Sequence, residues 1–94
     1  MGNKDNNVQL YVNELKKLVA RLIYDIDYKD SLILYTLKLT NLQESFALCS
    51  PDKNDLIRFN EILNVVKYSI EHQSWILLWE TTHYELSCLM EKHI

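Results

Sequence analysis

The sequence predicts an all-α fold and, more specifically, an antiparallel four-helix bundle. The chain of 94 residues contains one Gly and one Pro, which leaves little material for the turns of a β-sheet. Along most of the chain, apolar residues recur at steps of three and four, the period of an amphipathic helix. Four such segments of similar length are joined by short polar stretches, as in a bundle. The alternative is three helices, with a long C-terminal helix packed in a dimer.

Composition indicates one globular domain. Apolar residues make up 48% and charged residues 24% of the chain, a balance typical of folded rather than disordered proteins. Residues 1–7 are polar and are expected to form a disordered N-terminal tail, so the single helical domain is residues 8–94. The formal net charge is -3, and all of this excess lies in the second half of the chain.

The first helix is predicted from Val8 to Ile26. Its polar side includes Lys16, Lys17 and Arg21, and its apolar residues follow the helical period on the other side. The apolar residues are Val8, Tyr11, Val12, Leu15, Leu18, Val19, Leu22, Ile23 and Ile26. One side of this helix should therefore be buried and the other should face water.

The second helix is predicted to begin at Asp30, whose carboxylate can accept amide hydrogens of the first turn as an N-cap. One apolar stripe then follows steps of four and three, a pattern that a strand cannot produce. That stripe consists of Tyr35, Leu39, Leu42, Phe46 and Cys49. Ile33 and Leu37 form a second stripe on another side of the helix.

The third helix is predicted from about Pro51 to Ile70. A Ser50 N-cap followed by Pro51 at the first helical position is a typical helix start. The residues expected to face inward are Leu56, Phe59, Leu63, Val66 and Ile70. Ile57 and Tyr68 are displaced around the helix from this inward face.

The fourth helix is predicted after a turn at residues 71–74, with Ser74 as its N-cap, and should end near Glu91. Because this turn lacks Gly and Pro, an unbroken helix stays open as the alternative. One face of the fourth helix carries the inward residues Trp75, Leu78, Trp79, Thr82, Leu86, Leu89 and Met90. Leu77, Tyr84 and Cys88 fall on roughly the opposite side.

These faces predict more apolar surface than one small bundle can bury, and surplus apolar surface is typical of interaction sites. The expected core anchors are Trp75, Trp79, Leu86, Phe46 and Phe59. The expected partner-binding residues are Leu77, Tyr84, Cys88, Ile57, Tyr68, Ile33 and Leu37. The partner is expected to be another protein or a second copy of the chain.

No catalytic, cofactor or metal site is predicted. Glu80 and His83 form a Glu-x-x-His pattern that di-metal bundles use in two copies, but only one copy is present here. Cys49 and Cys88 have no partner at metal-ligand spacing and indicate thiols in a reducing compartment. With no apolar run near the roughly 20 residues of a spanning helix, a cytoplasmic location and no membrane partner are expected.

Nucleic acid and small-molecule substrates are not expected as partners. Lys16, Lys17 and Arg21 form the main basic cluster, but nucleic-acid-binding domains usually carry a clear positive excess. The segment Arg21, Asp25 and Asp27 before a Leu-rich helix resembles the start of the all-helical chorismate mutases. That resemblance implies an enzyme alternative in which Arg21, Lys38 and Arg58 would hold a dicarboxylate.

The segment from Ile70 to Met90 also supports a family resemblance. It combines a short polar break with Trp75, Leu78, Glu80, Tyr84 and Leu89, and it resembles the Trp-anchored helical hairpin of FliT-type flagellar export chaperones. More loosely, it is similar to the small acidic helical chaperones of type III secretion systems. The resemblance implies a chaperone that masks an aggregation-prone helix of a secretion-system protein.

The sequence therefore predicts a non-catalytic protein-binding protein, a small cytoplasmic chaperone or adaptor that buries an amphipathic helix of its partner. Two alternatives stay open. One is an immunity or inhibitor protein that blocks a toxin or enzyme. The other is a dimeric transcriptional regulator that contacts DNA through Lys16, Lys17 and Arg21.

Overall fold

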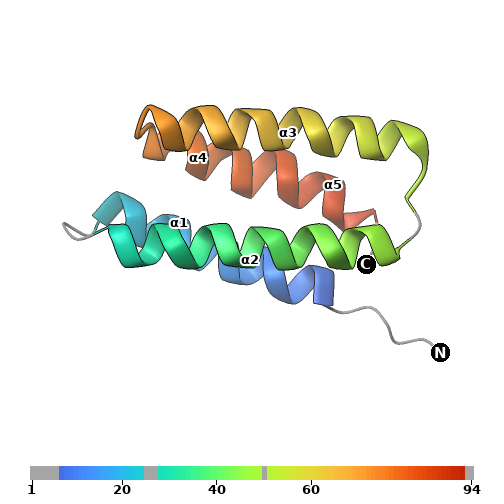
Figure 1. The fold of residues 1–94 in the computed structure, drawn as a ribbon, viewed down its shortest axis with the longest axis horizontal. Helices are drawn as coiled ribbons and strands as arrows, with labels where there is room; N and C mark the ends of the chain where they lie inside the picture. The colour runs from blue at the N-terminus through green and yellow to red at the C-terminus, as the bar shows by residue number, and fades with distance from the viewer. Residues whose placement is uncertain (1–6, 25–27, 50, 93–94) are drawn as a thin grey trace.

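The computed structural model describes residues 7–24, 28–49 and 51–92, and most of these residues are helical (Figure 1). Between short connections the chain forms α1 (Asn7–Tyr24), α2 (Lys29–Leu48) and α3 (Lys53–Glu71). A last helical rod, called the C-terminal helix below, joins α4 (Trp75–Glu80), the π-helix η2 (Thr81–Leu86) and α5 (Ser87–Glu91). No strand occurs among the described residues, so the prediction of an all-α fold is confirmed. The predictions for residues 1–6, Ile26 and Ser50 fall outside these ranges.

The helices form a body measuring 43 × 23 × 17 Å. The first helix, α1, packs against α2 and against all three segments of the C-terminal helix. On the other side, α3 also packs along the C-terminal helix (Figure 1). None of the helices formed by the described residues has the length and apolar character that crossing a membrane requires.

The turn between α3 and the C-terminal helix ends α3 with a Schellman motif. Ser74 N–H donates to Ser69 O at 2.8 Å, and Gln73 N–H donates to Ile70 O at 3.1 Å, which satisfies carbonyls that the helix end leaves unpaired. Gln73 has a φ of 53°, the left-handed conformation that this motif requires. The chain therefore breaks here, and the alternative of three helices is wrong. Ser74 is the N-cap residue as predicted, although its side chain forms no capping hydrogen bond.

The predicted start of the second helix was wrong by a short distance. The N-cap of α2 is Tyr28, which forms no side-chain capping bond, and Asp30 lies inside the first turn. A carboxylate in the first turn still stabilises the helix, because it lies near the positive end of the helix dipole.

The predicted start of the third helix was also wrong. The N-cap of α3 is Asp52, whose Oδ1 accepts a hydrogen bond from the Asp55 N–H at 2.8 Å. Pro51 precedes the helix and is not its first residue. A carboxylate cap satisfies one unpaired amide and also lies favourably on the helix dipole, so Asp52 rather than Ser50 fixes the start of α3.

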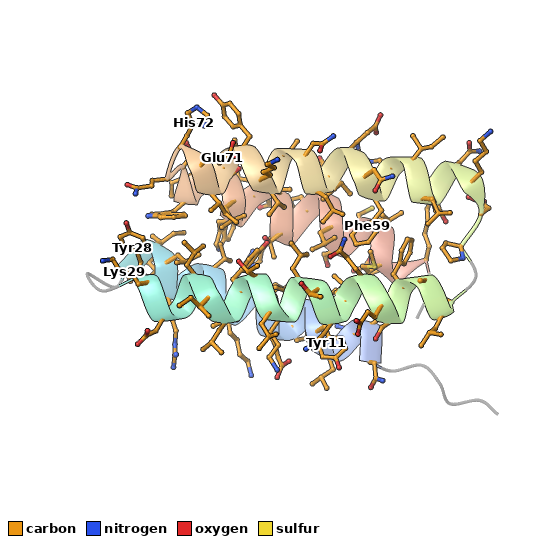
Figure 2. The ribbon with its side chains drawn as sticks, viewed as in Figure 1. Tyr11, Tyr28, Lys29, Phe59, Glu71 and His72 are labelled. Carbon is orange, nitrogen blue, oxygen red and sulfur yellow. The ribbon has the colours of Figure 1, made fainter. Side chains whose placement is uncertain are left out.

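The core follows the predicted helical faces in α1 and α2 and departs from them in α3. The fully buried apolar residues are Val8, Val12, Leu15, Leu18, Val19, Leu22, Tyr35, Leu42, Phe46, Phe59, Ile62, Val66, Leu78, Leu86, Leu89 and Met90. The rings of Phe46 and Phe59 meet edge to face at 4.8 Å, and Phe59 lies between α3 and α2 (Figure 2). Leu56 is exposed, contrary to the prediction, because the buried face of α3 runs through Phe59, Ile62 and Val66.

Candidate functional site

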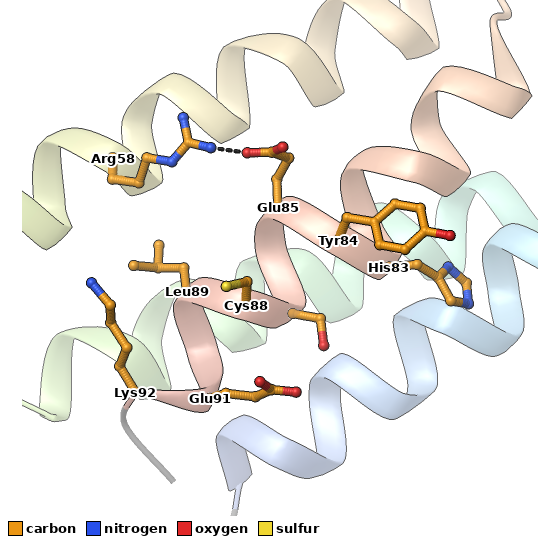
Figure 3. Close-up of a pocket in the computed structure, with 9 residues that line it drawn as sticks. Arg58, His83, Tyr84, Glu85, Cys88, Leu89, Glu91 and Lys92 are labelled. Carbon is orange, nitrogen blue, oxygen red and sulfur yellow. Dashed lines mark ion pairs between the residues drawn. The ribbon is translucent and has the colours of Figure 1, made fainter.

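The outer side of the C-terminal helix contains an open hollow with a volume of about 510 Å³ (Figure 3). Arg58 of α3 forms one wall, and every other lining residue comes from η2, α5 and Lys92. These other residues are His83, Tyr84, Glu85, Ser87, Cys88, Leu89, Glu91 and Lys92. The hollow therefore combines an aromatic ring and a thiol with charged groups of both signs.

The hollow begins where the C-terminal helix changes from α to π geometry. Ser87 N–H donates to Thr82 O, five residues earlier, which is the hydrogen bond that defines a π-helix. Thr82 and Leu86 of this segment are buried, whereas Tyr84 and Glu85 are exposed. The widened turn therefore keeps Thr82 in the core and presents Tyr84 and Glu85 at the surface. Single π turns within α-helices are frequent at functional sites.

A buried hydroxyl pair holds this segment against α2. The Tyr35 hydroxyl and Thr82 Oγ1 lie 2.8 Å apart, and both residues are fully buried. Burial raises the pKa of Tyr35 to about 12, despite the hydrogen bond to Thr82, which acts in the opposite direction. A buried hydroxyl without a partner costs free energy, so each hydroxyl satisfies the other and fixes the segment to α2.

An aromatic cluster forms one rim of the hollow. The Trp79 ring stacks on the His83 ring at 4.3 Å and meets the Tyr84 ring edge to face at 5.8 Å. His83 Nδ1 lies 3.1 Å from Trp79 O, and because a carbonyl oxygen can only accept, Nδ1 must carry the hydrogen. These contacts fix the orientation of His83 and support the exposed ring of Tyr84.

The basic groups around the hollow are already paired with carboxylates. The guanidinium of Arg58 contacts Glu85, as Figure 3 shows, and also lies 3.5 Å from Glu61 Oε1. Lys92 Nζ lies 3.4 Å from Asp55 Oδ1. Such exposed pairs contribute little to stability, on the order of 1 kcal/mol or less. They nevertheless leave the hollow with no unpaired basic side chain among its lining residues.

Among the predicted partner-binding residues, the hollow brings together Tyr84 and Cys88. Both are exposed, whereas Leu77, predicted to lie with them, is half-buried. Ile57 and Tyr68 are exposed on α3 and do not line the hollow. The ring of Tyr68 instead stacks on that of His72, near the end of α3, at 4.1 Å.

Ile33 and Leu37 are also exposed, but on the far side of the molecule. Their helix, α2, meets the C-terminal helix through Tyr35 and Thr82 in the core. Ile33 and Leu37 project from the side of α2 roughly opposite to Tyr35, and they are 66% and 53% exposed. The predicted residues therefore do not form one continuous surface.

The predicted core anchors lie in or beside the core. Leu86, Phe46 and Phe59 are buried, whereas Trp75 and Trp79 are partly buried and pack against the core. The Trp75 ring lies 5.4 Å from that of Tyr28, at the end of the molecule where α2 begins. Trp79 contributes to the rim of the hollow, a role that its apolar spacing alone could not indicate.

Comparisons with known proteins do not assign the chain to a family. No protein-family model matches it, and no curated protein or solved structure is significantly similar to it. Among the described residues, no group of three His, Cys, Asp or Glu side chains could hold a metal ion. Glu80 is exposed, and His83 stacks on Trp79. Lys38 and Arg58, considered for a dicarboxylate, are each within 4 Å of a carboxylate of this chain.

Sequence reasoning did not identify Arg58, Glu91 and Lys92 as lining residues. Arg58 reaches the hollow from α3, and no pattern within one helix shows which residue of another helix will face it. The sequence does contain a signal for the π-helix. The buried residues Leu78, Thr82, Leu86 and Met90 follow one another at steps of four. In an α-helix each such step drifts by about 40° around the axis, and a wider turn removes part of that drift.

Proposed function

We propose that this chain is a non-catalytic protein-binding protein, a small chaperone or adaptor that holds an amphipathic helix of its partner against the hollow. The observation that carries the proposal is the exposure of Tyr84 and Cys88 inside a hollow on a helix whose opposite face forms the core. Tyr84 is 60% exposed, and tyrosine is among the side chains most often found at the energetic centre of protein interfaces.

The shape and lining of the hollow support a helix as the bound element. The hollow is open and follows consecutive turns of one helix, from His83 to Lys92, which suits an extended ligand better than a small enclosed molecule. A partner helix can place its apolar residues on Tyr84 and Cys88 and leave its other side in water. Binding would therefore cover apolar surface that the isolated chain leaves in contact with solvent.

The test compares two matched double variants as baits for proteins from the source organism. Tyr84→Ser with Cys88→Asn removes the apolar lining, and Ile33→Ser with Leu37→Asn removes apolar surface from the opposite side of the molecule. Because all four residues are exposed, both variants should keep the helical content of the wild type by circular dichroism. A partner captured by the wild type should be lost from the first variant and retained by the second. Equal capture by all three proteins contradicts the proposal.

The cellular setting is part of the same proposal. We place the protein in the cytoplasm and take its partner to be an aggregation-prone helix of a secretion-system protein, as the FliT-type resemblance of Ile70 to Met90 implies. Co-expression with such a partner should increase the soluble fraction of the partner, and Tyr84→Ser with Cys88→Asn should abolish that increase. Nucleic acid, membrane lipid and small molecules are not expected as ligands.

We also propose that the four helical rods form an antiparallel bundle. Gln73 Nε2 donates to the Tyr28 hydroxyl at 3.0 Å, so the start of α2 and the turn after α3 meet at one end. The ion pair between Lys92 and Asp55 supports the C-terminal helix ending beside the start of α3. Spin labels at Lys53 and Glu91 should therefore lie much closer together than labels at Lys53 and Glu71, which the length of α3 separates by roughly 27 Å.

A further inference from the structure

We propose that the segment bound in the hollow is a basic amphipathic helix, with a Lys or Arg near each end of an apolar centre. This inference rests on the proposed function and identifies the chemistry of its partner. It follows from the charges around Tyr84 and Cys88, from two carboxylates that pair with no basic side chain in the described part of the chain, and from the length of helix between these carboxylates.

The first observation is the charge balance around the hollow. Among the lining residues, the basic Arg58 and Lys92 are matched in number by the acidic Glu85 and Glu91. Three further carboxylates lie outside the lining: Asp55 and Glu61 face these cations, and Glu80 is exposed one turn before Tyr84. The lining and these three neighbours together hold five carboxylates and two cations, so the excess of negative charge lies around the hollow rather than within its lining. A surface with such an excess attracts a basic partner and repels an acidic one.

The second observation is which carboxylates remain available. Both cations already face carboxylates, because Arg58 contacts Glu61 and Glu85 and Lys92 lies near Asp55. Glu80 and Glu91 are exposed, and no basic side chain of the described residues lies within ion-pairing distance of either. These two carboxylates are therefore free to pair with an incoming Lys or Arg.

The third observation is the spacing of these two carboxylates along the C-terminal helix. Glu80 lies one turn before Tyr84, and Glu91 lies about one turn after Cys88, so the acidic residues flank the apolar centre. Glu91 follows Glu80 by eleven positions, which corresponds to roughly 16 Å along the helix axis. A helix bound alongside could pair with both carboxylates if two of its basic residues were about three turns apart, with apolar residues between them.

A second copy of this chain offers the reverse pattern and is therefore not the occupant. Its most basic surface is the outer side of α1, where Lys17, and Arg21 of the last turn, lie between the exposed Leu10 and Tyr24. Around the hollow, the carboxylates Glu80 and Glu91 lie on either side of Tyr84 and Cys88 in the chain, whereas Glu85, between them, is paired with Arg58. If the hollow bound the outer side of α1, charged groups would face apolar groups both at the centre and at the ends of the contact. Such an arrangement disfavours binding.

The experiment selects ligands from a displayed library of 18-residue helix-forming peptides with randomised surface positions. Selection on the wild-type protein should enrich Lys or Arg at two positions ten or eleven residues apart, with apolar residues between them. Selection on Glu80→Lys with Glu91→Lys should instead enrich Asp or Glu at those two positions. Enrichment without a charge preference on either protein overturns the inference.

Binding of one selected peptide, measured by calorimetry, provides the matched comparison. Glu80→Lys with Glu91→Lys should weaken the peptide about tenfold or more, since two attractions become repulsions. Glu44→Lys with Glu71→Lys makes the same change in net charge at exposed sites on α2 and α3, and it should weaken binding less than about threefold. An equal effect of the two pairs indicates only general charge attraction and overturns the inference.

The same peptides distinguish failure of the inference from failure of the proposed function. Peptides that lose binding to Tyr84→Ser with Cys88→Asn, but are insensitive to charge reversal at Glu80 and Glu91, leave the hollow as a binding site and overturn its basic specificity. Peptides whose binding is unaffected by Tyr84→Ser with Cys88→Asn bind elsewhere, and this result overturns both proposals.

Discussion

The Tyr35 hydroxyl and Thr82 Oγ1 lie 2.8 Å apart in the core and join the middle of α2 to the π-helix η2. This pair joins two fully buried hydroxyls from different helices. Since Thr82 also supplies the carbonyl that accepts the five-residue hydrogen bond from Ser87, the pair connects the core to the turn that shapes the hollow. Four predictions concern this pair and the ends of the helices.

Removing both hydroxyls of the pair should cost less than the sum of the costs of removing each one alone. In Tyr35→Phe the Thr82 hydroxyl is left buried without its Tyr35 partner, and in Thr82→Val the same happens to Tyr35, so each should lower the free energy of unfolding by about 1–3 kcal/mol. The double variant should be less destabilised than the sum of the single variants. Urea denaturation of all four proteins measures this coupling. Strictly additive losses would mean that the hydroxyls do not interact.

The stability of the protein should fall between about pH 10 and pH 12 because of Tyr35. Its pKa is raised from 10.0 to about 12 in the folded protein, so the unfolded chain ionises first as the pH rises. The stabilisation is fully present below pH 10 and is lost as the pH passes the folded value, a change of about 3 kcal/mol. Unfolding measured as a function of pH should show a smaller alkaline loss in Tyr35→Phe. Identical pH profiles would contradict the prediction.

Replacing Gln73 by Gly should stabilise the turn between α3 and the C-terminal helix. Gln73 has a φ of 53°, a conformation that costs residues with a Cβ about 1 kcal/mol relative to Gly. The variant also loses the exposed hydrogen bond from Gln73 Nε2 to Tyr28, so the net gain should be about 0.5–1 kcal/mol. Gln73→Ala is the control, because it loses the same hydrogen bond and keeps the strain. Thermal unfolding should rank Gly above Gln, and Gln at or above Ala.

Removing the cap of α3 should destabilise the protein by about 1 kcal/mol. In Asp52→Ala the Asp55 N–H loses the carboxylate that it contacts at 2.8 Å. Asp52→Asn keeps an acceptor at the same position and should lose only the charge–dipole contribution, a few tenths of a kcal/mol. Chemical denaturation measures both. An equal loss in the two variants would assign the effect to charge rather than to the hydrogen bond.

Much of the fold could be predicted because burial in α1 and α2 follows the 3.6-residue period. Tyr35, Leu42 and Phe46 are buried, while Ile33 and Leu37, on the second stripe, are exposed. Such one-sided patterns indicate which face of a helix is buried, even when the helices that cover that face are not known. The helix starts were less predictable, since Ser, Asp and Asn can all cap a helix and the chain offers several near each start.

The details of the hollow could not be predicted, because they depend on contacts between helices and on one hydrogen-bond register. Arg58 meets Glu85 only once α3 lies beside η2, and the two residues are far apart in the chain. The sequence allows both a turn and an unbroken helix before the C-terminal helix, because the left-handed residue is Gln73 rather than the Gly usual at that position. Leu77 is half-buried although it lies on the stripe opposite the core face.

The contact of Trp79 with both His83 and Tyr84 provides an intrinsic optical reporter at the edge of the hollow. A ligand covering Tyr84 changes the polarity around this indole, so the emission of Trp79 should shift in wavelength or intensity as the hollow fills. The chain has two Trp residues, and the second, Trp75, lies against Tyr28. Replacing Trp75 by Phe leaves one emitter, and occupancy can then be followed in solution without attaching a dye.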